Sequence, residues 1–172
     1  MEDSNKLSVE LDLQNPNNVE SLPTLLEMKT WCEAAIQIES HQKVFENSLS
    51  VVLRVVDSDE SADLNQTYRE KEGPTNVLSF PNDVPEFMLD ITELNAHNSH
   101  LGDLVICESL VQKEAEEQGK SVVSHWAHLI IHGVLHLQGF DHIDNDEAVA
   151  METLEIQLLE QLGFQNPYTK QS

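Results

Sequence analysis

Three histidines in the last third of the chain have the spacing of a metal-binding site. His132 and His136 lie four residues apart in a stretch with helical periodicity, so their imidazole rings project from one face of a helix. Gly139 can adopt the left-handed backbone conformation that turns a chain back, which would bring His142 to the same point. Three imidazole ligands with a fourth position open are typical of a catalytic zinc site. The sequence therefore predicts one Zn²⁺ per chain, bound by these three histidines.

The residue after the first histidine limits the chemistry of this site. Residues 132–142 have the H-x-x-x-H-x-x-G-x-x-H spacing of the metzincin proteases, in which a glutamate follows the first histidine and serves as the base. Gly133 occupies that position here, so a metalloprotease is the less favoured alternative. Phosphodiester cleavage depends more on positive charge around the phosphoryl oxygens, which a metal ion and an arginine can supply.

Arg69 is the candidate for this second positive charge. It clusters with Arg54 and Lys71 in a chain that has only nine lysines and arginines. A surface salt bridge is the alternative for Arg69 in so acidic a protein. His128 lies one turn before His132, where it could be a base or, as the sequence favours, a neutral buried imidazole. Arg69 and His128 are the catalytic candidates, with Lys71 as an assistant; the general base stays unassigned.

Composition sets the class of protein. A chain of 172 residues with 40% hydrophobic residues suits one soluble domain, and no apolar run approaches the roughly 20 residues that cross a bilayer. The polar, acidic N-terminus lacks the features of a secretory signal, so a cytoplasmic location is expected. The net charge of −22 excludes the broad basic surface of most nucleic-acid-binding proteins. Any nucleic acid must be held locally.

Periodicity predicts an α+β (mixed α/β) fold, with a single four-stranded mixed sheet and about five helices. Period-two or β-branched segments predict strands at 7–13, 49–56, 77–80 and 101–107. Apolar stripes predict helices at 23–38, 121–138 and 144–162, and capping residues or a glycine stop predict helices at 57–69 and 110–118. The helix at 121–138 is apolar around most of its circumference, so it should be central, and it carries the histidine pair. Cys32 and Cys107 are expected to be buried thiols. Residues 82–99 are expected to form a flexible loop with a short turn near 87–89.

Three segments resemble the YbeY endoribonucleases, also called rRNA maturation factors. Residues 132–142 are similar to that family's H-G-x-L-H-L-x-G-[YF]-D-H signature. Residues 64–81 resemble its L-N-x-x-Y-R-x-K-[DE]-x-P-T-N-V-L-S-F-P segment, and residues 101–107 resemble its L-G-D-[IL]-x-I strand. The resemblance implies a zinc-dependent, single-strand-specific endoribonuclease. His132, His136 and His142 would be its metal ligands and Arg69 its active-site arginine.

The resemblance also implies a cellular role. The expected function is ribosomal RNA maturation, notably at the 3′ end of the small-subunit RNA, and ribosome quality control. Expected partners are single-stranded RNA, ribosomal RNA and the small ribosomal subunit, without DNA or membrane, for a monomeric protein. A non-catalytic ribosome-assembly factor with a structural zinc is the more serious alternative.

Overall fold

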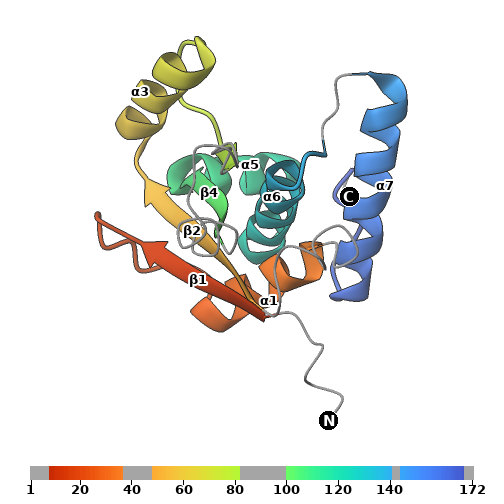
Figure 1. The fold of residues 1–172 in the computed structure, drawn as a ribbon. Coiled ribbons are helices and arrows are strands. Elements are labelled where there is room, and N and C mark those ends of the chain that lie inside the picture. The colour runs from red at the N-terminus through yellow and green to blue at the C-terminus, as the bar shows by residue number, and fades with distance from the viewer. Residues whose placement is uncertain (1–7, 37–47, 82–99, 141–143, 169–172) are drawn as a thin grey trace, which may run out of the picture.

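The computed structural model of the protein describes residues 8–36, 48–81, 100–140 and 144–168. Within these ranges it has one four-stranded mixed sheet and five helices, which confirms the predicted α+β fold (Figure 1). The strands are β1 (Ser8–Gln14), β2 (Ser48–Val56), β3 (Val77–Pro81) and β4 (His100–Cys107), and the helices are α1 (Leu25–Ala35), α3 (Ser58–Arg69), α5 (Glu108–Gln118), α6 (Val122–Leu137) and α7 (Asn145–Gln161).

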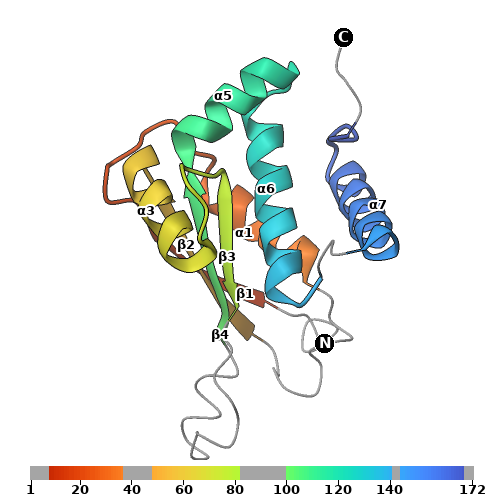
Figure 2. The same ribbon diagram turned by 90° about the horizontal axis from the view of Figure 1, so that it is seen from above.

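The sheet has the strand order β1-β2-β4-β3. β1, β2 and β4 are parallel, whereas β3 pairs antiparallel with β4, with Ser79 opposite Leu104. β3 is therefore an edge strand. Figure 2 shows α3 on one side of this strand and α6 on the other, with α7 beyond α6. The edge of β3 thus separates the end of α3 from the helix that carries the histidines.

Helix α6 is the central buried helix, as its apolar circumference predicts. Trp126, Ile130 and Val134 are fully buried in the main hydrophobic core, which also includes residues of α1, α7 and the sheet. Ser121 caps the N-terminus of α6 by accepting a hydrogen bond from the Ser124 N–H. Two histidines of the predicted metal set therefore stand on a rigid element.

Local signals set the ends of the neighbouring helices. Asp57 and Asp144 cap α3 and α7 by accepting hydrogen bonds from backbone N–H groups three residues ahead. Gly139 has a φ of +100°, so the left-handed turn expected after α6 is present. α5 starts at Glu108, two residues before its predicted start, because the chain enters it directly from β4. Both cysteines are free and buried, as predicted.

Two other sequence expectations concern the loop at 82–99 and membrane-spanning segments. The expected loop at 82–99, with its turn near 87–89, lies outside the described residues. None of the described helices has the length and hydrophobicity needed to cross a lipid bilayer.

Gly102 allows β3 and β4 to approach closely, and we expect Gly102→Ala to destabilise the fold. A Cβ atom at this position would lie 2.6 Å from the carbonyl oxygen of Phe80 and 2.7 Å from Leu137 Cδ2, and the backbone φ is +156°. We expect the free energy of unfolding to fall by about 2–3 kcal/mol, the usual cost of overpacking. Urea denaturation would measure it.

Gly73→Ala is the matched control for this substitution. Gly73 also has a positive φ, +86°, but a Cβ there would meet nothing within 4 Å. Its cost should be about 1 kcal/mol from backbone strain alone. Equal losses in the two variants would show that the contact with Phe80 is unimportant.

Candidate active site

A cleft of about 1430 Å³ collects most of the residues singled out by the sequence. Its lining includes Arg69, His128, His132 and His136, together with Lys71, and comes from α3, the following loop, β3, α5, α6 and the segment after α7. The structure therefore brings two predicted metal ligands and both catalytic candidates to one concave surface. The third predicted ligand, residue 142, lies outside the described residues.

His132 and His136 face one another across one turn of α6. Their Nε2 atoms are 3.1 Å apart and their ring centroids are 4.6 Å apart. Two nitrogens bound tetrahedrally to one zinc ion, each at about 2.0–2.1 Å, would be separated by about 3.3 Å. The pair therefore fits a shared metal ion, with each ring using its Nε2 atom.

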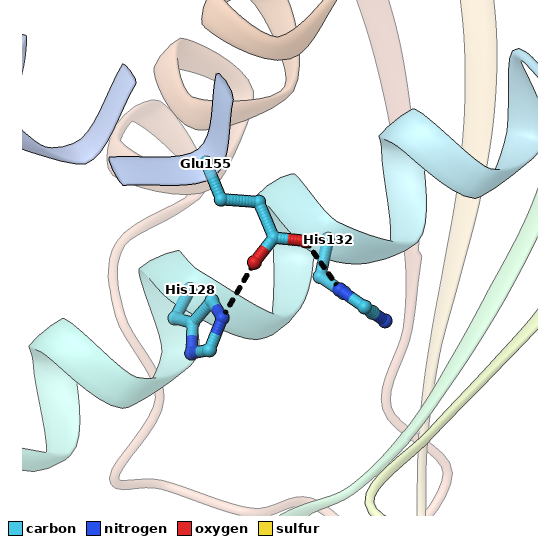
Figure 3. A group of neighbouring side chains, drawn as sticks. All are labelled: His128, His132 and Glu155. Atoms are coloured by element: carbon cyan, nitrogen blue, oxygen red, sulfur yellow. Dashed lines mark hydrogen bonds and ion pairs between the residues drawn. The ribbon is translucent and has the colours of Figure 1, made fainter. Parts of the chain in front are cut away.

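Glu155 of α7 holds His132 from behind. Its carboxylate is 0% exposed, and its Oε2 atom accepts a hydrogen bond of 2.5 Å from His132 Nδ1. Figure 3 shows this carboxylate between His132 and His128, two residues of the same helix. A proton on Nδ1 leaves the lone pair of His132 on Nε2, which is the atom that meets His136. Glu155 therefore fixes both the orientation and the tautomer that metal binding needs.

The other oxygen of Glu155 is also occupied. Its Oε1 atom accepts hydrogen bonds from His128 Nε2, at 3.0 Å, and from the Tyr168 hydroxyl. Burial raises the pKa of Glu155, but the hydrogen bonds from His128, His132 and Tyr168 outweigh burial and hold the pKa at about 2. Burial and the bond to Glu155 raise the pKa of Tyr168. The network is therefore one ionised carboxylate that accepts hydrogen bonds from three side chains.

A second candidate metal set overlaps the first. Ligand atoms of His128, His132 and Glu155 all lie within 4.8 Å of one another, so these side chains could also hold a metal ion. However, the 2.5 Å between His132 Nδ1 and Glu155 Oε2 is much shorter than the roughly 3.3 Å expected between two ligands of one zinc. That distance suits a hydrogen bond, so the geometry favours the pair of His132 and His136.

His128 belongs to the hydrogen-bond network behind the metal pair. Its Nε2 atom donates to Glu155 and lies 3.2 Å from the Tyr168 hydroxyl oxygen. Its Nδ1 atom is buried and has no hydrogen-bond partner among the described residues. These contacts make His128 a half-buried partner of Glu155, and its part in catalysis stays a prediction.

Arg69 is held at the edge of β3 without a carboxylate partner among the described residues. Its Nη2 atom donates to the Ser79 carbonyl at 2.6 Å, and its Cζ atom lies 5.1 Å from the centroid of the Phe80 ring. Arg54, by contrast, pairs with Glu60 at 2.6 Å. Among the described residues, Arg54 therefore has a carboxylate partner and Arg69 has none. The charge of Arg69 remains available to an anion in the cleft.

A further network joins the loop before β3 to α6. Glu114 of α5 accepts hydrogen bonds from Asn76 Nδ2 at 3.0 Å and from His125 Nε2 at 2.8 Å, and all three residues line the cleft. Sequence spacing did not indicate this network, nor Glu155 and Tyr168. Their partners lie on other elements, so only the fold brings them together.

Burial of His125 predicts that the metal-free protein loses stability in mild acid. Burial lowers the pKa of His125 from 6.5, and Lys120 and His128 lower it further, whereas the hydrogen bond to Glu114 raises it. Near pH 6.5, His125 therefore binds a proton in the unfolded chain but stays unprotonated in the folded chain. As the pH falls below 6.5, unfolding should become easier, by at most about 1.4 kcal/mol per pH unit from this group.

Urea denaturation of wild type and His125→Gln between pH 7.5 and 5.5, in the presence of a chelator, would measure this effect. At pH 7.5 the variant is expected to have a lower free energy of unfolding than wild type, but this free energy should fall less as the pH is lowered to 5.5. Parallel curves for the two proteins would mean that His125 does not cause the pH dependence.

Comparison with known proteins gives one consistent family. The model of the family "Endoribonuclease YbeY" matches residues 12–163. Relatives of that name include the proteins of Pseudomonas putida (48% identity; 93% of this chain and 93% of the relative), Pseudomonas syringae (49%; 93% and 88%) and Methylococcus capsulatus (48%; 93% and 95%). The solution structure of TM1509 from Thermotoga maritima shares the fold, with a TM-score of 0.50 and 18% identity over 94% of this chain and all of that one. This chain belongs to the YbeY endoribonuclease family.

Proposed function

We propose that this protein is a zinc-dependent endoribonuclease that hydrolyses phosphodiester bonds of single-stranded RNA. Its role is the maturation of ribosomal RNA, at the 3′ end of the small-subunit RNA, and ribosome quality control in the cytoplasm. The observation that carries the proposal is the convergence of two imidazole Nε2 atoms, 3.1 Å apart, in a cleft that also contains the guanidinium of Arg69, which has no carboxylate partner among the described residues. The names of its relatives support the RNA substrate.

His132 and His136 would hold the metal ion, with His142 as the predicted third ligand. A zinc ion bound there supplies Lewis-acid chemistry, lowering the pKa of water and withdrawing charge from a phosphoryl oxygen. The donor set fits, because the Nδ1 bond of His132 to Glu155 leaves its Nε2 lone pair directed at the shared position. Glu155 stays ionised, since its hydrogen-bond donors hold its pKa at about 2.

Arg69 would bind the phosphoryl oxygens that gain charge during cleavage. The Ser79 carbonyl and the Phe80 ring fix its guanidinium, so little reorganisation is needed when the charge develops. Lys71 lines the same cleft and would add positive charge. His128 contributes through Glu155, whose position it helps to fix.

The charge distribution fits a short, unpaired substrate. The chain as a whole carries a net charge of −22, and the cleft lining contains Glu114, Glu116 and Glu117 beside the cations Arg69, Lys71 and Lys120. Positive charge is therefore confined to a few local groups. A long duplex would meet the acidic surface beyond these groups, whereas a single strand can enter the cleft alone. DNA duplexes and membranes are therefore not expected partners.

The peptidase alternative is further weakened by packing. A Cβ atom on Gly133 would lie 2.7 Å from Leu104 Cδ2 and 3.3 Å from the Ser79 hydroxyl oxygen. The glutamate that metzincins use at this position would therefore require the Leu104 side chain to move.

The test is cleavage of one RNA sequence as a single strand and as a duplex. Cleavage should require the single strand, stop with a chelator and return with added zinc. Arg69→Gln should lower kcat/KM at least about tenfold, whereas Arg54→Gln, which changes an arginine already paired with Glu60, should have little effect. Zinc-loaded protein that binds small ribosomal subunits but cleaves no RNA would instead support the assembly-factor alternative.

A further inference from the structure

Tyr68 is an exposed aromatic side chain that the proposed mechanism does not use. It is 58% exposed and comes directly before Arg69 at the end of α3. The other exposed tyrosine among the described residues, Tyr168, has a role already, because its hydroxyl donates to Glu155. A large ring next to an active-site cation, with this much of its surface open to solvent, is available for contact with a ligand.

The ring of Tyr68 is exposed but not loosely held. It meets the Phe80 ring edge to face, with centroids 5.3 Å apart and an interplanar angle of 74°, while the Arg69 guanidinium lies over the same Phe80 ring. Arg69 also donates to the Tyr68 carbonyl at 3.3 Å. The ring thus stands in a fixed position beside a fixed positive charge.

The backbone below Tyr68 is fixed as well. Glu70 ends α3 in the left-handed conformation, with its N–H directed to the carbonyls of Asn65 and Gln66. The Asn65 side chain then donates to the Gly73 carbonyl at 2.9 Å, which ties the following loop to the helix. An element held in this way loses little conformational entropy when a ligand binds.

We propose that Tyr68 is a stacking platform for one unpaired base of the RNA substrate, next to a phosphate bound by Arg69 and Lys71. The inference rests on the proposed function and extends it to a base subsite. An aromatic face beside cations is how single-stranded nucleic acid is bound without reading its sequence. Bases inside a duplex are stacked on their neighbours, so only an unpaired base can use this ring. The subsite therefore gives a physical reason for single-strand specificity.

The position of β3 defines the path of the RNA strand across the protein. Arg69 reaches the edge of β3 through its bond to Ser79, and Figure 2 shows α3 and α6 on opposite sides of that strand. The RNA would cross this edge, with the bound phosphate at Arg69, the stacked base on the α3 side, and the scissile bond on the α6 side with the histidines.

The experiment measures kcat and KM of the zinc-loaded enzyme on RNA oligonucleotides in which each base near the cut is replaced, one at a time, by an abasic residue. One position should lower wild-type kcat/KM by about 5- to 100-fold. Tyr68→Ala should lower kcat/KM on intact RNA by a similar factor. For this variant, making that position abasic should cause no further loss of kcat/KM. Tyr68→Phe and Tyr68→Trp should keep wild-type kcat/KM, because stacking needs the ring and not the hydroxyl.

Two matched variants separate stacking from other effects. Leu26→Ala removes a side chain that is 73% exposed on α1, a helix that contributes no residue to the cleft lining, and should leave kcat and KM unchanged. Arg69→Gln should reduce the salt dependence of binding by about one phosphate contact, whereas Tyr68→Ala should weaken binding with an unchanged salt slope. Wild-type activity in Tyr68→Ala, or additive losses with every abasic position, would overturn the base subsite while leaving the nuclease intact. Failure of the wild type to cleave RNA would remove both.

Discussion

Alanine at His136 is expected to remove bound zinc and RNA cleavage together. The substitution deletes one of two Nε2 atoms that are 3.1 Å apart, so the remaining imidazole would bind a metal ion with one fewer ligand. Zinc affinity should fall by more than about 100-fold, beyond the 10- to 100-fold that changes around a metal ligand usually cost. Competition with a chromophoric chelator measures the affinity, and cleavage at matched zinc occupancy measures the activity.

A panel of three alanine variants distinguishes the two candidate metal sets. His132 belongs to both sets, so His132→Ala should lose zinc in either case. His136→Ala should lose zinc only if the two Nε2 atoms form the site, and His128→Ala only if the site includes Glu155. We expect His128→Ala to retain most of its zinc. Normal zinc affinity in His136→Ala, together with its loss in His128→Ala, would place the ion between α6 and α7, at His128, His132 and Glu155.

Local physics explains why the architecture could be predicted. Segments 49–56 and 101–107 are rich in apolar and β-branched residues, as is typical of parallel strands covered on both faces, and they appear as β2 and β4. Capping residues mark where helices begin, as Asp57 and Asp144 do, and a glycine marks where a helix ends, as Gly139 does after α6. These signals act over a few residues, so sequence periodicity captures them.

The functional site could be predicted only in part, because its spacing signals lie within single elements. His132 and His136 share one helix, and their approach follows from helical geometry alone. Glu155 reaches His132 from another helix, 23 residues further along, through the packing of α7 on α6. One signal does exist, since Glu155 falls between Met151 and Leu158 on the buried stripe of α7. A carboxylate in such a stripe indicates a buried partner.

Replacing Glu155 should weaken metal binding without touching a metal ligand. Glutamine keeps the shape of the side chain, but its amide nitrogen cannot accept the proton of His132 Nδ1. His132 would then lose its preferred tautomer, and zinc affinity should fall by about 10- to 100-fold. The unfolding free energy of the metal-free protein should fall by about 1–3 kcal/mol, because a donor buried around the carboxylate loses its acceptor. Chelator competition and urea denaturation measure the two effects.

The tautomer itself separates positioning from a general loss of structure. In the metal-free protein, imidazole nitrogen NMR should show the proton of His132 on Nδ1 in wild type and a shift towards Nε2 in Glu155→Gln. Tyr168→Phe removes one donor to Glu155 and keeps the ring, so its effect should have the same direction and be smaller. Glu160→Gln makes the same chemical change at an exposed position of α7 and is the control. If Glu155→Gln bound zinc as tightly as Glu160→Gln, the carboxylate would serve the packing of α7 alone, and His132 would owe its orientation to α6.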